Sequence, residues 1–142
     1  MDRDQQKAFA WDNSNLASLL DDVGNFEQAL VHYGMAQEVF VAVDGDNSLS
    51  VADTQNNIAI VYEQQGKFEN ALELYGAALE TTVRVVGHGH PLVADTLVNI
   101  GVVYYKQGKA AEAKELFPRA YKIRLDKLGP NHPDTTTLRP FV

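Results

Sequence analysis

A pattern of residues returns every 42 positions, and this period restricts the fold more than any other feature of the chain. Each copy has an asparagine at the same phase (Asn15, Asn57, Asn99) and, nine residues later, a glycine (Gly24, Gly66, Gly108). Self-similarity with a period of roughly 20–50 residues is typical of stacked supersecondary units. The sequence therefore predicts a repeat protein, in which each unit buries an apolar face against the next.

Each copy contains two stretches in which apolar residues recur at steps of three and four, the spacing of an amphipathic helix. This spacing predicts helices over residues 10–23, 26–43, 49–65, 67–86, 90–107 and 109–128. We expect an all-α fold, a right-handed superhelical solenoid of antiparallel helix pairs. Its expected parts are a polar, frayed tail over 1–9, repeats over 10–47, 48–89 and 90–131, and a truncated fourth first-helix or capping tail over 132–142.

Composition narrows the class of protein. The chain has no cysteine, which excludes disulfides, thiolate metal sites and a cysteine nucleophile and suits a reducing compartment. The charged start lacks the apolar core of a signal peptide, and no apolar run approaches the ~20 residues of a membrane span. We therefore expect a soluble cytoplasmic protein with no membrane contact.

The net charge of −7 is unevenly distributed. Residues 1–44 hold eight acidic and two basic side chains, whereas residues 87–142 hold five acidic and eight basic. The sequence thus predicts an acidic first repeat and a basic last repeat.

The second repeat carries a series of small and aromatic residues that resembles the tetratricopeptide repeat: Ala59, Tyr62, Gly66, Phe68, Ala71, Tyr75 and Ala78. The 42-residue period, His90-Pro91 and Gly129-Pro130-Asn131-His132-Pro133 resemble the kinesin light chain type of this repeat. The resemblance implies a non-catalytic interaction module that holds an extended peptide in a concave groove, as in kinesin light chain cargo binding. It implies no cofactor.

In this family the first helix of each pair lines the groove. On the predicted first helices, polar residues share one stripe opposite packing residues such as Ile58 and Tyr62. An asparagine ladder in this stripe suits a peptide main chain, since each amide both donates and accepts; alternatively, the asparagines bond backbone carbonyls of neighbouring helices. Besides Trp11, the stripe contains Asn15, Ser18, Asp22, Asp53, Asn57, Ile60, Gln64, Asp95, Asn99, Val102 and Lys106.

Charge indicates the kind of peptide. The basic positions of the family's carboxylate clamp fall on Ser14, Asp95 and Asn99, so recognition of an acidic chaperone tail is not expected. The carboxylates near the expected groove instead favour a basic or neutral segment; they are Asp21, Asp22, Asp53, Glu63 and Asp95.

The sequence gives weaker support to metal binding, nucleic-acid binding and catalysis. His88-Gly89-His90 is interpreted as a turn and a helix start rather than a metal site. The basic residues of the third repeat, Arg124 among them, alternate with acidic ones and are interpreted as a solvated face rather than a nucleic-acid site. No nucleophile–base pair or phosphate-binding loop is visible, so we expect no enzyme.

Two features of the sequence allow more than one interpretation. Pro118 falls in the middle of a predicted helix, with Gly34 and Gly76 at the corresponding positions, which indicates a bend or a close neighbour. The unfinished fourth repeat ends in Phe141 and Val142 and leaves apolar surface on the third pair. It suggests an alternative function, a self-assembling structural repeat with weak self-association through the C-terminal end.

Overall fold

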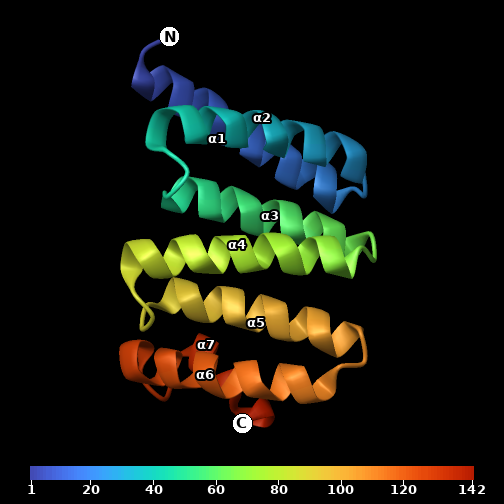
Figure 1. The fold of residues 1–142 in the computed structure, drawn as a ribbon, viewed down its shortest axis with the longest axis vertical. Coiled ribbons are helices and arrows are strands. Elements are labelled where there is room, and N and C mark those ends of the chain that lie inside the picture. The colour runs from blue at the N-terminus through green and yellow to red at the C-terminus, as the bar shows by residue number, and fades with distance from the viewer. The chain divides into compact units, whose positions relative to one another are not determined.

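The computed structural model describes all 142 residues, and the chain forms only helices, turns and loops (Figure 1). It divides into two compact units, Met1–Thr81 and Thr82–Val142. The first unit holds α1 (Arg3–Asp22), α2 (Phe26–Asp44), α3 (Leu49–Gln64) and most of α4 (Phe68–Val86). The second holds the end of α4, α5 (Pro91–Lys106), α6 (Ala110–Leu128), α7 (Pro133–Thr136) and the 3₁₀ turn η1 (Arg139–Phe141). The all-α class and the predicted succession of helices are confirmed.

The 42-residue period corresponds to one repeated turn between the two helices of a pair. In each copy a glycine has a positive φ, 82° at Gly24, 76° at Gly66 and 78° at Gly108. The next amide then donates to a carbonyl five residues back, as from Lys67 N to Tyr62 O at 2.8 Å. A left-handed residue ends a helix in this way with little steric cost only if it is glycine. The recurring glycines therefore fix where each first helix stops.

The expectation of a frayed tail over 1–9 was wrong, because α1 already begins at Arg3. Asp2 and Gln5 form a capping box: Asp2 Oδ1 accepts from Gln5 N at 2.8 Å, and Asp2 N donates to Gln5 Oε1 at 3.0 Å. Arg3 and Lys7 also reach Asp44 at the end of α2, each at 3.3 Å. Two amides at the helix start thus gain partners, and the first turns are held to the second helix.

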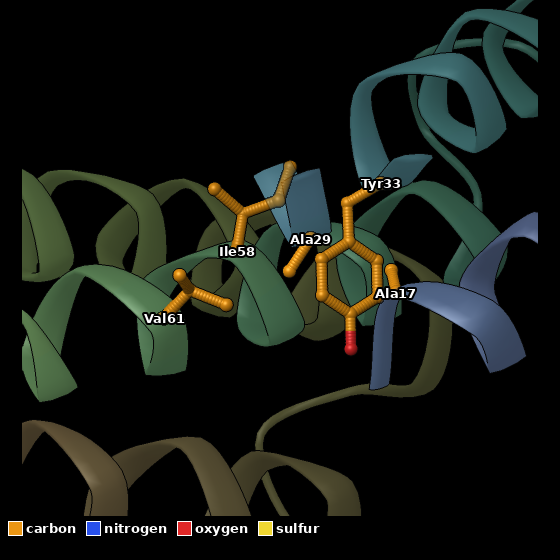
Figure 2. Packing of buried hydrophobic residues seen from close by; sticks show 5 residues of the cluster. All are labelled: Ala17, Ala29, Tyr33, Ile58 and Val61. Carbon is orange, nitrogen blue, oxygen red and sulfur yellow. The ribbon is translucent and has the colours of Figure 1, made fainter. Parts of the chain in front are cut away.

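The core of the first unit shows why small and aromatic residues recur. Tyr33 from α2 lies beside Ala17 of α1 and Ala29 of its own helix, with Ile58 and Val61 of α3 completing the cluster (Figure 2). All five are buried. The alanines leave room for the phenol ring between the helices, so α3 packs against a surface that both helices of the first pair create.

In the second unit the same arrangement is tighter. Gly101 of α5 takes the place of Ala17, and a Cβ there would come within 2.8 Å of the Phe117 ring of α6. Phe117 is covered in turn by Phe141 of η1, with ring centroids 5.0 Å apart. The fourth first-helix expected from the sequence is here a single turn, α7, followed by η1, which brings Phe141 against α6.

Pro118 lies inside α6, which continues as one helix through it. Its ring is exposed and helps to line a hollow of about 400 Å³ together with Phe141 and Val142 of the C-terminal turn. Pro118 and η1 thus border the same hollow. At the corresponding Gly34 and Gly76, an added Cβ would meet nothing within 4 Å, so no neighbour requires a glycine there.

Candidate peptide-binding surface

In the first unit the predicted stripe lies on α1 and α3, away from the core residues Ile58 and Val61. On α1 its members are solvent-exposed; they are Asn15, Ser18 and Asp22. On α3, Asp53 and Gln64 are exposed, and Asn57 and Ile60 are half-buried. The stripe is therefore accessible along both first helices of this unit.

In the second unit the stripe lies on α5. Asp95 and Lys106 are exposed, and Asn99 and Val102 are half-buried. Val102 and Lys106 also border a hollow of about 300 Å³ whose other walls are Tyr105, Phe117 and Phe141. This end of the stripe thus joins an aromatic surface that the sequence did not place there.

The ladder asparagines have no intramolecular hydrogen bond: none joins the side chain of Asn15, Asn57 or Asn99 to another residue. The structural asparagine of the first pair is Asn13. Its amide nitrogen donates to Phe9 O at 2.9 Å, and its Oδ1 lies 2.9 Å from His32 Nδ1 of α2. Sequence reasoning missed Asn13 because only the first repeat has it, so no periodic signal pointed to it.

Negative charge gathers in the first unit. Asp53 is exposed as a residue, but neighbouring groups partly desolvate its carboxylate and so raise its pKa, and it forms no ion pair. Burial also raises the pKa of Asp21, and the charge of Asp22 raises it further, while hydrogen bonding by Gln64 opposes both. Burial raises the pKa of Tyr33 as well; the Ser18 hydroxyl opposes this, and the charges of Asp21, Asp53 and Asp22 add to it. This part of the stripe therefore carries carboxylates that no cation neutralises.

Asp95 has a different environment, because its carboxylate is paired. Arg124 Nη2 of α6 donates to Asp95 Oδ1 at 3.0 Å, and Arg124 Nη1 donates to the Asp134 carbonyl of α7 at 2.9 Å. Arg124 is buried. The interpretation of Arg124 as part of a solvated basic face was wrong: this guanidinium joins three helices, and its charge is offset within the protein.

The same phase of the repeat holds an aromatic pair in the first unit. Trp11 and Phe40 lie two periods before Asp95 and Arg124, and their rings meet edge to face with centroids 4.7 Å apart. Trp11 remains partly exposed at the end of the α1 stripe, whereas Phe40 is fully buried. An apolar contact and an ion pair thus fill equivalent places.

His90 is part of a helix cap, as predicted. Its Nδ1 accepts from Leu92 N at 3.1 Å at the start of α5, and His132 Nδ1 does the same for Asp134 N at 3.1 Å at the start of α7. No group of three or more His, Cys, Asp or Glu side chains is arranged to hold a metal ion. None of the helices has both the length and the apolar character that a membrane crossing requires.

Comparison with known proteins agrees with this geometry. The family model of the tetratricopeptide repeat matches residues 8–82, 50–126 and 92–139. The crystal structure of BtubC (BKLC) from P. vanneervenii is 31% identical, with a TM-score of 0.85, and the match covers 99% of this chain and 55% of that one. This chain thus spans about half the length of that protein.

Two further structures share the fold at lower identity. A putative kinesin light chain from Podosopora anserina with nearly identical TPR-like repeats is 19% identical over 89% of this chain and 60% of that one, with a TM-score of 0.78. The N-terminal domain of stress-induced protein-1 from C. elegans is 21% identical over 96% of both chains, with a TM-score of 0.67. Among curated proteins no match is found.

The fold and the stripe define a helical-repeat protein of the kind built from antiparallel helix pairs. The chain belongs to the tetratricopeptide repeat family. Repeats of this family generally mediate protein–protein interaction, and the fold is typically a non-catalytic scaffold.

Proposed function

We propose that this chain is a cytoplasmic, non-catalytic interaction module that binds an extended peptide segment of a partner protein along the stripes of its first helices. The observation that carries the proposal is that the amides of Asn15, Asn57 and Asn99 recur at one phase and make no bond within the protein. Asn15 is exposed, and Asn57 and Asn99 are partly exposed. A carboxamide matches both the N–H and the C=O of an extended main chain. Binding through main-chain groups places few demands on the sequence of the ligand.

The carboxylates determine the charge of the segment that is bound. Asp53 has no internal cation, and its raised pKa reflects the energetic cost of its ionised form. A lysine or arginine of a ligand would relieve that cost. Asp95 attracts a cation less strongly, since Arg124 already offsets its charge. The proposed ligand is therefore basic or neutral, with its basic residue opposite α3 rather than α5.

The test uses immobilised arrays of linear peptides in three classes, rich in Lys and Arg, neutral, and rich in Asp and Glu. We expect the wild-type chain to bind the basic and neutral classes. The double substitution Asn57→Ala with Asn99→Ala should reduce this binding by about tenfold or more, since each lost amide removes hydrogen bonds to the peptide. Helical content, measured by circular dichroism, should not change.

The control is Asn70→Ala, which removes an exposed amide from α4, outside the stripe. It should leave binding unchanged. Asp53→Asn should weaken the basic class only, and by less at high salt, because ions screen the interaction. Preference for the acidic class, or equal binding by the control and the double variant, would contradict the proposal.

A second candidate function, a self-assembling repeat, is favoured by one observation at the other end of the chain. Tyr105, Phe141 and Val142 all expose much of their side chains, and they border the hollows at α5, α6 and η1. An exposed cluster of large apolar residues is typical of a contact surface. In this alternative, copies of the chain associate weakly through this C-terminal surface.

A further inference from the structure

The first helix pair exposes an apolar surface on the side away from α3. We name it the outer face. It consists of Leu16 and Leu19 of α1, Val23 at the C-terminal cap of α1, and Val31 and Met35 of α2, all of which are exposed. The contact between Asn13 and His32 marks the side on which α1 and α2 face each other. At about 100° per residue, Val31 lies on the opposite side of His32 from Tyr33, which packs toward α3. The same reasoning on α1 directs Leu16 and Leu19 away from α3, so the five side chains share one face of the pair.

The molecule itself shows how such a face is covered. One period later, Ile58 and Val61 occupy the positions of Leu16 and Leu19, and there they pack against Ala29 and Tyr33 of the preceding pair (Figure 2). Leu16 is 42% exposed where Ile58 is 8% exposed, and Leu19 is 64% exposed where Val61 is fully buried. The outer face therefore has the composition of a surface that is buried elsewhere in the same fold.

The other members of the outer face are not explained by the repeat pattern. Val23 corresponds to Gln65 and Gln107, and Val31, which is 60% exposed, corresponds to Glu73 and Glu115. Met35 corresponds to Ala77 and Arg119. The first repeat thus has apolar residues where the other repeats mostly place polar ones. An unpaired face of a repeat is normally polar, so these substitutions point to a contact.

Charge indicates which surface makes this contact. Asp12 of α1 and Glu27 and Glu38 of α2 flank the outer face, and all three are exposed. The C-terminal surface pairs exposed Tyr105, Phe141 and Val142 with Lys106 and Lys114, which border the same hollows. Two outer faces would repel each other, whereas an outer face and a C-terminal surface complement each other in both apolar character and charge.

We propose that the outer face of one copy binds the C-terminal surface of a second copy. The contact is heterologous: one copy keeps a free C-terminal surface and the other a free outer face, so association can continue beyond the dimer. This inference builds on the self-association described above as the second candidate function, for which it names the complementary surface.

The experiment blocks one surface at a time. Leu19→Lys places a cation on the outer face, and Tyr105→Glu places an anion on the C-terminal surface; both residues are exposed, so the fold is retained and circular dichroism verifies this. Light scattering over a concentration series at low salt should show the wild-type chain growing beyond dimers. Each variant alone should remain monomeric over a concentration range at least about tenfold wider.

The decisive measurement is the equimolar mixture. The Leu19→Lys protein keeps its C-terminal surface and the Tyr105→Glu protein keeps its outer face, so together they should form a one-to-one dimer that grows no further. Val85→Lys, at another exposed apolar residue, is the matched control and should associate like the wild type. Added salt should weaken the dimer.

Three results would overturn the inference: a wild-type chain that stays monomeric, a Leu19→Lys variant that associates like the wild type, or a mixture that forms no dimer. If Leu19→Lys still associates while Tyr105→Glu does not, the contact joins two C-terminal surfaces. The second candidate function then stands without the outer face. Leu19 lies outside the stripe, so Leu19→Lys is not expected to change binding on the peptide arrays. Its effect on association therefore tests this inference separately from the peptide proposal.

Discussion

Two helical glycines of this protein differ in how much space surrounds them. Gly101 faces the Phe117 ring, which an added Cβ would approach to 2.8 Å, whereas at Gly34 an added Cβ would meet nothing within 4 Å. We expect Gly101→Ala to lower the free energy of unfolding by about 1–3 kcal/mol through overpacking. Gly34→Ala should raise it by about 1 kcal/mol, because alanine favours the helix and restricts the unfolded chain. Denaturant titration measures both, and a shift in the same direction would refute this account of the packing.

Asp53 and Asp95 lie at the same phase of the repeat, but replacing each by asparagine should change the stability of the protein in opposite directions. The raised pKa of Asp53 means that folding favours its protonated form, so its ionisation lowers stability as pH rises through the range between its unfolded and folded pKa values. Asp53→Asn should therefore stabilise the protein at neutral pH, with the gain vanishing in acid. Asp95→Asn should destabilise it by about 1–2 kcal/mol, because buried Arg124 loses its anionic acceptor. Unfolding curves at several pH values test the pair, and equal effects at pH 7 would contradict it.

At the scale of elements, one position begins the first helix of successive pairs with different side chains. Ser48 Oγ accepts from Val51 N at 3.4 Å in α3, and His90 Nδ1 accepts from Leu92 N at 3.1 Å in α5. We therefore expect His90→Ser to be tolerated and His90→Ala to lower the free energy of unfolding by about 1 kcal/mol, the usual effect of losing an N-cap. If serine proves as harmful as alanine in denaturant unfolding, His90 has a role other than capping.

The helices differ in how far the sequence could predict them. The paired helices could be predicted from two signals: the glycines that end the first helices, and the small residues that leave room for Tyr33 and Phe117. Both signals are local in the sequence or recur with the repeat. The start of α1 at Arg3 was missed, although Asp2 and Gln5 have the spacing of a capping box. The burial of Arg124 was not predictable in this way. Its partners are Asp95, 29 residues away, and a backbone carbonyl of Asp134, so only the tertiary fold identifies them.

Helical spacing predicted which residues share one side of the first helices, but not the chemical environment of each. Helical spacing placed Asn57, Asp53 and their counterparts on one side, and the structure keeps them accessible there. Spacing did not distinguish Asp53, which lacks a cation, from Asp95, which has one. Nor did it show that Phe141 packs on Phe117 beside this stripe, because no repeat before the third has a counterpart of η1.

For the whole molecule, the distribution of charge along the chain is more informative than the net charge of −7. Residues 1–44 carry eight acidic against two basic side chains, a net −6, and residues 87–142 carry five against eight, a net +3. The unpaired carboxylates and the outer face both lie in the first unit, and the C-terminal surface lies in the second. Each unit therefore has a surface of different charge and apolar character on one repeated framework.

Similarity between repeats exposes a chain to a particular folding error, in which a helix pairs with the wrong copy of its partner. The pairs Trp11–Phe40 and Asp95–Arg124 make that error unfavourable. If α5 docked on α2, Asp95 would meet Phe40, and Arg124 would be left without its carboxylate, which is costly for a buried guanidinium. Chemically distinct pairs at one phase thus favour the native pairing of helices over the alternatives, even where the rest of the repeat is similar.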